Sequence, residues 1–334
     1  MGAASGRESQ EIRGRRPLPQ PPGELLTAEE LRSLTRLSPW RSTWLIVHCW
    51  GVILATWVAV GIWTHPLTVL LGILIIGARQ LGLGILMHDG AHMRLYRNKR
   101  LNDWVCEWIL SRPLLGASVD GYRKYHLQHH RFTQQAEDPD LGLSRPFPIP
   151  RASLRRKILR DLTGRTGIKQ YGAAIRSAFA GGPEHSGRLA AVRSGLRRLG
   201  PNLLINLGFF AGFAAAGEWY LYFLLWWVPA LTWNRLVTRI RNIGEHAGVP
   251  DDDDPLRNTR TTRASLLERA FLAPYFVNYH LEHHLFVSIP CYRLRQAHRL
   301  LLAKGWGERM EVQPDYLTML RGVTLPTPVS PLAR

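Results

Sequence analysis

The chain has 334 residues, of which 46% are hydrophobic, and 43 Lys and Arg against 25 Asp and Glu give a formal net charge of +18. That charge admits either an anionic membrane surface or nucleic acid as a partner, and the concentration of apolar residues in runs of membrane length favours the membrane. Three widely spaced cysteines without a C-x-x-C pair, Cys49, Cys106 and Cys291, exclude a disulfide framework and a four-cysteine zinc module.

The first segment, residues 1–41, is predicted to be a basic, largely disordered tail, because Arg and Pro are frequent and it has no apolar core of its own. No apolar h-region opens the chain, so a cleaved signal peptide is not expected. Within the tail, the run from Thr27 to Glu30 has the pattern of a capping box that starts a short surface helix.

Apolar segments predict four membrane crossings. No Asp, Glu, Lys or Arg occurs from Thr43 to Ala78, which is too long for one crossing of a ~30 Å hydrocarbon layer by ~20 helical residues. Pro66 supplies the break within it. A short apolar piece at 104–118 is expected at the membrane interface. The sequence therefore predicts transmembrane helices at about 43–63, 67–87, 202–217 and 219–237.

The section from 151 to 200 is rich in arginine, and apolar residues recur at helical spacing in its first part. This pattern predicts an amphipathic helix on an anionic membrane surface. The section offers few aromatic side chains to stack on bases, so nucleic acid is not an expected partner. Apart from Arg79 and Arg235, basic residues avoid the spans and their short hairpins, which makes the basic side and both termini cytoplasmic. High Arg and Ala content favours a bacterial inner membrane; a eukaryotic protein would lie in the endoplasmic reticulum.

Four short patches hold nine of the 13 histidines. Two patches read H-x-x-H-H, which on a helix turns three imidazoles to one face, with neighbouring Cβ atoms roughly 5–6 Å apart. Imidazole binds many transition metals, and one zinc ion takes only about four ligands, so nine histidines predict two metal ions in one cage. The patch residues are His88, His92; His126, His129, His130; Asn242, His246; and His280, His283, His284.

The motifs H-D-G-A-H at 88–92, H-L-Q-H-H at 126–130 and H-L-E-H-H at 280–284 resemble those of the integral-membrane fatty acid desaturase and hydroxylase superfamily. The likeness covers about 43–304 and includes Asp138-Pro139-Asp140 after the second motif. It implies an all-α integral membrane domain at 42–304, four transmembrane helices with a cytoplasmic helical cap that holds the metals, and a C-terminal tail at 305–334. Phe286 is followed by Val287, where close relatives continue Phe-Pro.

The resemblance also implies the site chemistry. Two nonhaem iron ions would use O₂ as co-substrate, with the nine patch histidines as ligands and Asn242 touching one metal through water. No catalytic residue beyond the metal ligands is expected. Three acids next to ligands, Asp89, Glu245 and Glu282, are expected to orient imidazoles.

The expected activity is an O₂-dependent oxidoreductase that introduces a double bond into a long acyl chain carried by lipid, CoA or carrier protein. Without a fused His-Pro-Gly-Gly haem motif, electrons must come from a separate ferredoxin, rubredoxin or b-type cytochrome. A hydroxylase or ketolase of an acyl chain, sphingoid base, alkane or carotenoid is the nearest alternative. A membrane metal-binding or transport protein is an alternative of another class, and it would need polar ligands within the spans.

Overall fold

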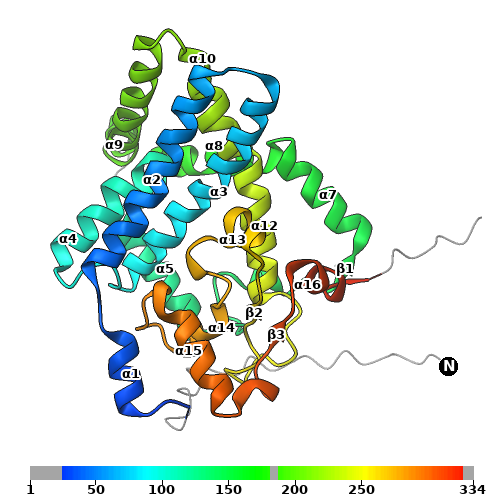
Figure 1. Cartoon of the computed structure of the whole chain (residues 1–334). Helices are drawn as coiled ribbons and strands as arrows, with labels where there is room; N and C mark the ends of the chain where they lie inside the picture. Colours follow the sequence, from blue (N-terminus) through cyan, green and yellow to red (C-terminus); the bar gives the residue numbers. More distant parts are fainter. Residues whose placement is uncertain (1–24, 181–186, 326–334) are drawn as a thin grey trace, which may run out of the picture.

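A computed structural model describes residues 25–180 and 187–325, and its fold is mostly helical (Figure 1). The elements are α1 (Ala28–Thr35), α2 (Pro39–Ile62), α3 (Pro66–Ala91), α4 (Lys99–Trp104), the π-helix η1 (Val105–Ser111), the 3₁₀ helix η2 (Arg112–Leu114), α5 (Val119–Arg131), α6 (Leu141–Ser144), β1 (Ile149–Pro150), α7 (Arg151–Leu162), α8 (Arg165–Phe179), α9 (Arg188–Ala215), α10 (Trp219–Tyr222), the π-helix η3 (Phe223–Trp227), α11 (Val228–Leu231), α12 (Trp233–His246), β2 (Thr261–Thr262), α13 (Leu266–Phe271), η4 (Pro274–Phe276), α14 (His280–Leu285), α15 (Cys291–Ala303), η5 (Trp306–Glu308), β3 (Val312–Gln313), α16 (Tyr316–Gly322) and β4 (Thr324–Leu325).

Helix α1 begins as the sequence predicts. The Thr27 side chain accepts a hydrogen bond from the Glu30 backbone N–H at 3.2 Å, and Glu30 Oε2 accepts one from the Thr27 N–H at 2.7 Å, so the capping box is confirmed. Leu34 of this helix is fully buried, so α1 packs on the protein. The rest of the predicted disordered tail, residues 1–24, lies outside the described part of the chain.

Helices α2 and α3 form an antiparallel pair that contains the first two predicted spans. Pro66 occupies the start of α3, where its missing N–H costs nothing, and His65 caps the helix by accepting from the Leu67 N–H. Within residues 25–180 and 187–325, these are the two helices whose length and apolar composition suffice to cross a membrane. The outer side of α2 leaves large apolar side chains uncovered, namely Trp44, Val47, Leu54, Val58 and Ile62.

The second pair of predicted spans is not confirmed. Residues 202–215 are the apolar end of the longer helix α9, whose first half is arginine-rich. The predicted span 219–237 is not one helix, because it divides into α10, η3, α11 and the start of α12. The helical backbone continues through α10, η3 and α11, and it is interrupted at Thr232, whose φ of −117° and ψ of −88° lie outside the helical region.

The expected tail at 305–334 is corrected for its described part. Residues 305–325 fold back onto the domain, where Tyr316 and Met319 are buried. Two short parallel strand pairs fasten this segment: β3 pairs with β2 and β4 pairs with β1, so the fold is not strictly all-α. Local periodicity could not reveal these pairings, because the paired strands lie far apart in sequence. Residues 326–334 lie outside the described part.

The elements that carry the histidine patches meet below the long helices (Figure 1). The ends of α3 and α12 approach α5 and α14 there. The Gln134 amide donates to the carbonyl of His246 at 2.7 Å, joining the loop after α5 to the end of α12. The Arg260 N–H donates to the carbonyl of Glu245 at 2.9 Å, which joins α12 to the chain that leads into β2. Segments distant in sequence are thereby held around one centre.

Candidate metal centre

The first patch sits where α3 ends. His88 lies on the last turns of the helix, and His92 follows it as the C-cap. Gly90 between them is required by packing, because a Cβ at this position would lie 1.9 Å from Cys106 Sγ. The Asn102 amide donates to the Gly90 carbonyl at 2.8 Å. Close contact with the segment 102–106 therefore fixes the backbone between the two histidines.

Five histidines form one group whose ligand-capable nitrogens all lie within 4.8 Å of one another. His130 Nε2 lies 2.9 Å from His126 Nε2 and 3.0 Å from His283 Nε2. Tyr122 stacks on the His126 ring, with ring centroids 5.3 Å apart. The group consists of His88, His92, His126, His130 and His283, contributed by α3, α5 and α14.

Four further histidines form a second group with the same mutual proximity. His280 Nε2 lies 2.8 Å from His246 Nε2. Two ligands at right angles on one ion, each about 2.1 Å from it, would have nitrogens about 3 Å apart, so these separations suit a shared ion. The group consists of His129, His246, His280 and His284, contributed by α5, α12 and α14.

The imidazoles have the chemical state that metal ligands require. The buried Nε2 atoms of His88, His92 and His284 have no hydrogen-bond partner among the described residues, which is costly unless another ligand satisfies them. Burial lowers the pKa of His92 to about 3 and holds the pKa of His126 and His280 well below the usual range. Neutral imidazole is the form that binds metal, so the donor set fits two metal ions.

Two carboxylates reach the other nitrogen of a grouped histidine. Asp138 Oδ1 lies 2.8 Å from His129 Nδ1, and both side chains are buried. Glu245 Oε1 lies 3.5 Å from His280 Nδ1 and accepts from Arg241 Nε at 2.6 Å. Burial raises the pKa of Glu245 to about 7, against the opposing charge of Arg241.

Asp89 and Glu282, expected to orient imidazoles of the site, make other contacts. Asp89 Oδ2 accepts from the Cys291 backbone N–H at 2.9 Å. Glu282 accepts from Thr261 Oγ1 at 2.5 Å and lies 2.6 Å from Nδ1 of His298, which belongs to neither group. The structure differs from the expectation here because these partners, the Cys291 backbone, Thr261 and His298, belong to neither histidine group.

The sequence predicts that all nine histidines lie in one site, but it does not predict some of the side chains that bond to them. The sequence analysis places Asp138 only in the D-P-D run after the second motif, although its position nine residues after His129 is a usable signal. Thr133 Oγ1, 3.2 Å from His284 Nδ1, gave no sequence signal. Asn242 lies on α12 one turn before His246, and its contact with a metal through water stays a prediction.

The fold and the two histidine groups define a helical protein with two histidine clusters that could each hold a metal ion. A sequence model described as "Fatty acid desaturase" matches residues 63–309, and the chain therefore belongs to the fatty acid desaturase family. Dihydrorhizobitoxine desaturase of Bradyrhizobium elkanii is 29% identical over 282 residues, which cover 78% of this chain and 77% of that protein. The chain is thus an enzyme of the desaturase type.

Proposed function

We propose that this enzyme introduces a double bond into a long acyl chain carried by lipid, CoA or carrier protein, using two nonhaem iron ions and O₂. The observation that carries the proposal is the pair of buried histidine groups in a chain of the desaturase family. In the overall reaction the substrate loses two hydrogens, and O₂ takes up these hydrogens, two electrons and two protons to leave two waters. A separate ferredoxin, rubredoxin or b-type cytochrome supplies the electrons.

The protein's own residues would bind the metal ions, orient the imidazole rings and keep bulk water away from the site. The nine histidines would hold the ions, which when bound supply the O₂ activation and C–H cleavage that no side chain can perform. Asp138 and Glu245 hold the rings of His129 and His280 from behind. Burial of the cage excludes bulk water from the reacting centre.

A hydroxylase or ketolase acting on an acyl chain, sphingoid base, alkane or carotenoid is the second candidate, since the same donor set serves either outcome. The relative from Bradyrhizobium elkanii carries the name of a desaturase, and this favours desaturation. The name of that relative gives dihydrorhizobitoxine as its substrate. Dihydrorhizobitoxine should therefore be tested on this enzyme as an alternative to a long acyl chain.

The product decides between these reactions. Total lipids from a host that expresses the enzyme with each candidate electron donor are expected to contain a species about two mass units lighter than its precursor. A species about sixteen units heavier would instead identify a hydroxylase, because one oxygen atom is retained. The matched control is the His129→Ala, His283→Ala double variant, in which either product should vanish because each histidine group has lost a ligand. Conversion of dihydrorhizobitoxine with no change in lipids would contradict the acyl substrate.

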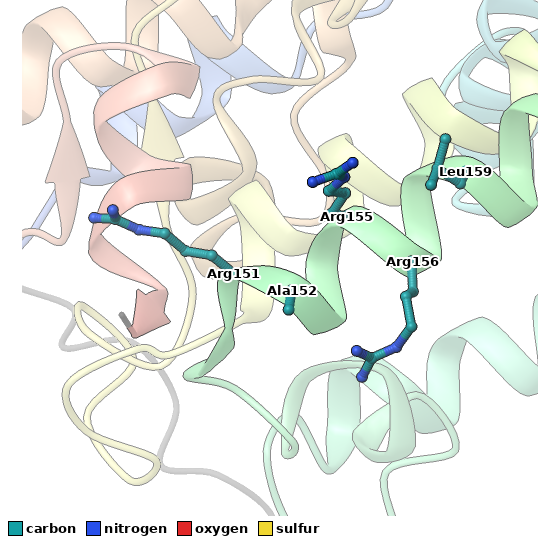
Figure 2. Close-up of a pocket in the computed structure, with 5 residues that line it drawn as sticks. All are labelled: Arg151, Ala152, Arg155, Arg156 and Leu159. Atoms are coloured by element: carbon teal, nitrogen blue, oxygen red, sulfur yellow. The ribbon is translucent and has the colours of Figure 1, made fainter. Parts of the chain in front are cut away.

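We also propose that the enzyme spans the membrane four times, with both termini and the histidine cage on the cytoplasmic side and α7 on an anionic lipid surface. Support comes from the uncovered apolar face of α2 and from α7, where Arg151, Arg155 and Arg156 extend around a shallow hollow of about 390 Å³ (Figure 2). Leu159 beside them is exposed, as an interfacial helix requires.

This topology predicts opposite labelling of two exposed positions. Cysteines introduced as Arg155→Cys and Trp63→Cys should react with a membrane-impermeant maleimide from the cytoplasmic and the external side, respectively. The native cysteines are buried and provide the background control. Labelling of both positions from the same side would contradict the proposal.

A further inference from the structure

Arg79 is a buried cation in the middle of α3 without an acidic partner among the described residues. Its side chain is 7% exposed. One guanidinium nitrogen donates to the Ala270 carbonyl at 2.5 Å, and the guanidinium lies 5.5 Å from the centre of the Tyr275 ring. Among the described residues, no carboxylate comes within the 4.0 Å that defines an ion pair with Arg79. Burying a charge without a counter-ion is costly, so this position favours an anionic ligand.

Two polar side chains adjoin Arg79. The Tyr275 hydroxyl lies 3.1 Å from His48 Nδ1 on α2, and the Cys49 thiol donates to the Arg79 carbonyl at 3.3 Å, which places α2 and α3 level with each other here. His48 is exposed, and within the described part of the chain Tyr275 is its hydrogen-bond partner. His48, Arg79 and Tyr275 therefore form one polar cluster with an open side on α2.

The backbone that carries Tyr275 is strained. Tyr275 and Phe276 have φ of 54° and 63°, in the left-handed region that side-chain-bearing residues rarely adopt. Gly82 makes room for the aromatic ring, since a Cβ there would lie 2.6 Å from Tyr275 Cε2. Backbone strain of this kind persists where the surrounding structure enforces it and is frequent at ligand sites.

Apolar surface borders the cluster on both sides. Leu266 and Leu267 on α13 are 81% and 73% exposed. The same helix carries Ala270, whose carbonyl accepts from Arg79, and Tyr275 follows it in η4. On α2, exposed Trp44 lies one turn before His48. From Trp44 to Trp63 the chain takes 19 residue steps, which rise about 28 Å at 1.5 Å per residue, close to the ~30 Å of a hydrocarbon layer. The cluster would then lie one turn inside the boundary that Trp44 marks.

We propose that His48, Arg79 and Tyr275 bind the phosphate of an anionic phospholipid, whose acyl chains lie along α2 and α13. The guanidinium and the hydroxyl supply hydrogen-bond donors to the phosphate, and apolar surface on both sides of the cluster accommodates two chains. The inference rests on the membrane placement proposed above, and it is independent of which substrate the enzyme oxidises.

Native mass spectrometry of the full-length protein, purified in a neutral detergent, tests this site. Phosphatidylglycerol, phosphatidylcholine with the same acyl chains, and palmitate are added in separate arms. The wild-type protein is expected to retain phosphatidylglycerol in preference to phosphatidylcholine. Arg79→Gln should weaken phosphatidylglycerol binding by about tenfold, because a charge-assisted hydrogen bond is lost. Arg36→Gln removes the same charge from an exposed position and should bind like the wild type.

His48→Gln keeps the proposal testable if Arg79→Gln does not fold, because His48 is exposed and its replacement leaves the contacts of Arg79 with Ala270 and Tyr275 in place. This variant should weaken phosphatidylglycerol binding about threefold. Equal retention of the two phospholipids by the wild type, or unchanged binding in both variants, would overturn the proposal. Binding of palmitate without phosphatidylglycerol would overturn the phospholipid assignment. Because the readout is lipid retention, a negative result leaves the double-bond proposal to be judged by its own product assay.

Discussion

Replacing His280 with alanine is expected to lower the bound metal from two ions per chain to one, and replacing His126 is expected to remove the other ion. The two residues belong to different histidine groups, and each group has its own set of converging nitrogens. Either loss should reduce product formation by more than about a hundredfold, since even outer contacts of a metal ligand cost 10–100-fold. Metal analysis of the purified variants by plasma mass spectrometry gives the count directly.

The matched control for these variants is His65→Asn. His65 lies outside both groups and caps α3 through its Nδ1, a role that asparagine preserves. This variant should keep both ions and full activity. Loss of both ions from each single variant would show that the nine histidines bind as one unit, contrary to the two groups. Zinc in place of iron in the wild-type protein would contradict the proposed oxidative chemistry.

Replacing Asp138 with asparagine is expected to weaken metal binding by about 10–100-fold, which is about 1.4–2.7 kcal/mol. The carboxylate accepts from His129 Nδ1 and so turns Nε2 towards the cage. It also accepts from the Gln134 and Asp140 backbone N–H groups, which fix its own position. Asparagine has a single acceptor oxygen and no negative charge, so it cannot accept from all three of these N–H groups as the carboxylate does. Competition with a chelator of known affinity measures the change.

Asp140→Asn is the control, because this carboxylate is the next acid along the chain and lies farther from the same imidazole. Its Oδ2 is 3.9 Å from His129 Nδ1, and its Oδ1 accepts from Tyr125 instead. Metal affinity should therefore change by less than about threefold. An equal effect of the two substitutions would mean that local charge alone matters, and that the hydrogen bond from Asp138 does not orient His129.

The histidine patches could be found from sequence because their spacing is helical. His126, His129 and His130 share one face of α5, as the i, i+3, i+4 pattern requires, and His283 and His284 come from α14 in the same way. Helix α3 was equally predictable, since Pro66 starts it and the uncharged run continues to Ala78. Both predictions depend on residues within one or two turns of each other.

Other features depend on contacts that the order of residues does not reveal. The sequence could not divide the nine histidines into a group of five and a group of four, because the ring of His246 comes beside that of His129 only in the folded chain. The return of residues 305–325 was missed for the same reason, because their strands pair with segments far away in the sequence.

By itself the sequence determined the helical character, the apolar pair of helices and the set of imidazoles that can bind metal, because these follow from local periodicity and side-chain chemistry. The tertiary structure alone decided which imidazoles converge, which carboxylates face them and where Arg79 lies, because these depend on packing between distant segments. Asp138 illustrates the difference. Its identity was plain in the sequence, and its contact with His129 exists only because the loop after α5 folds back on the helix.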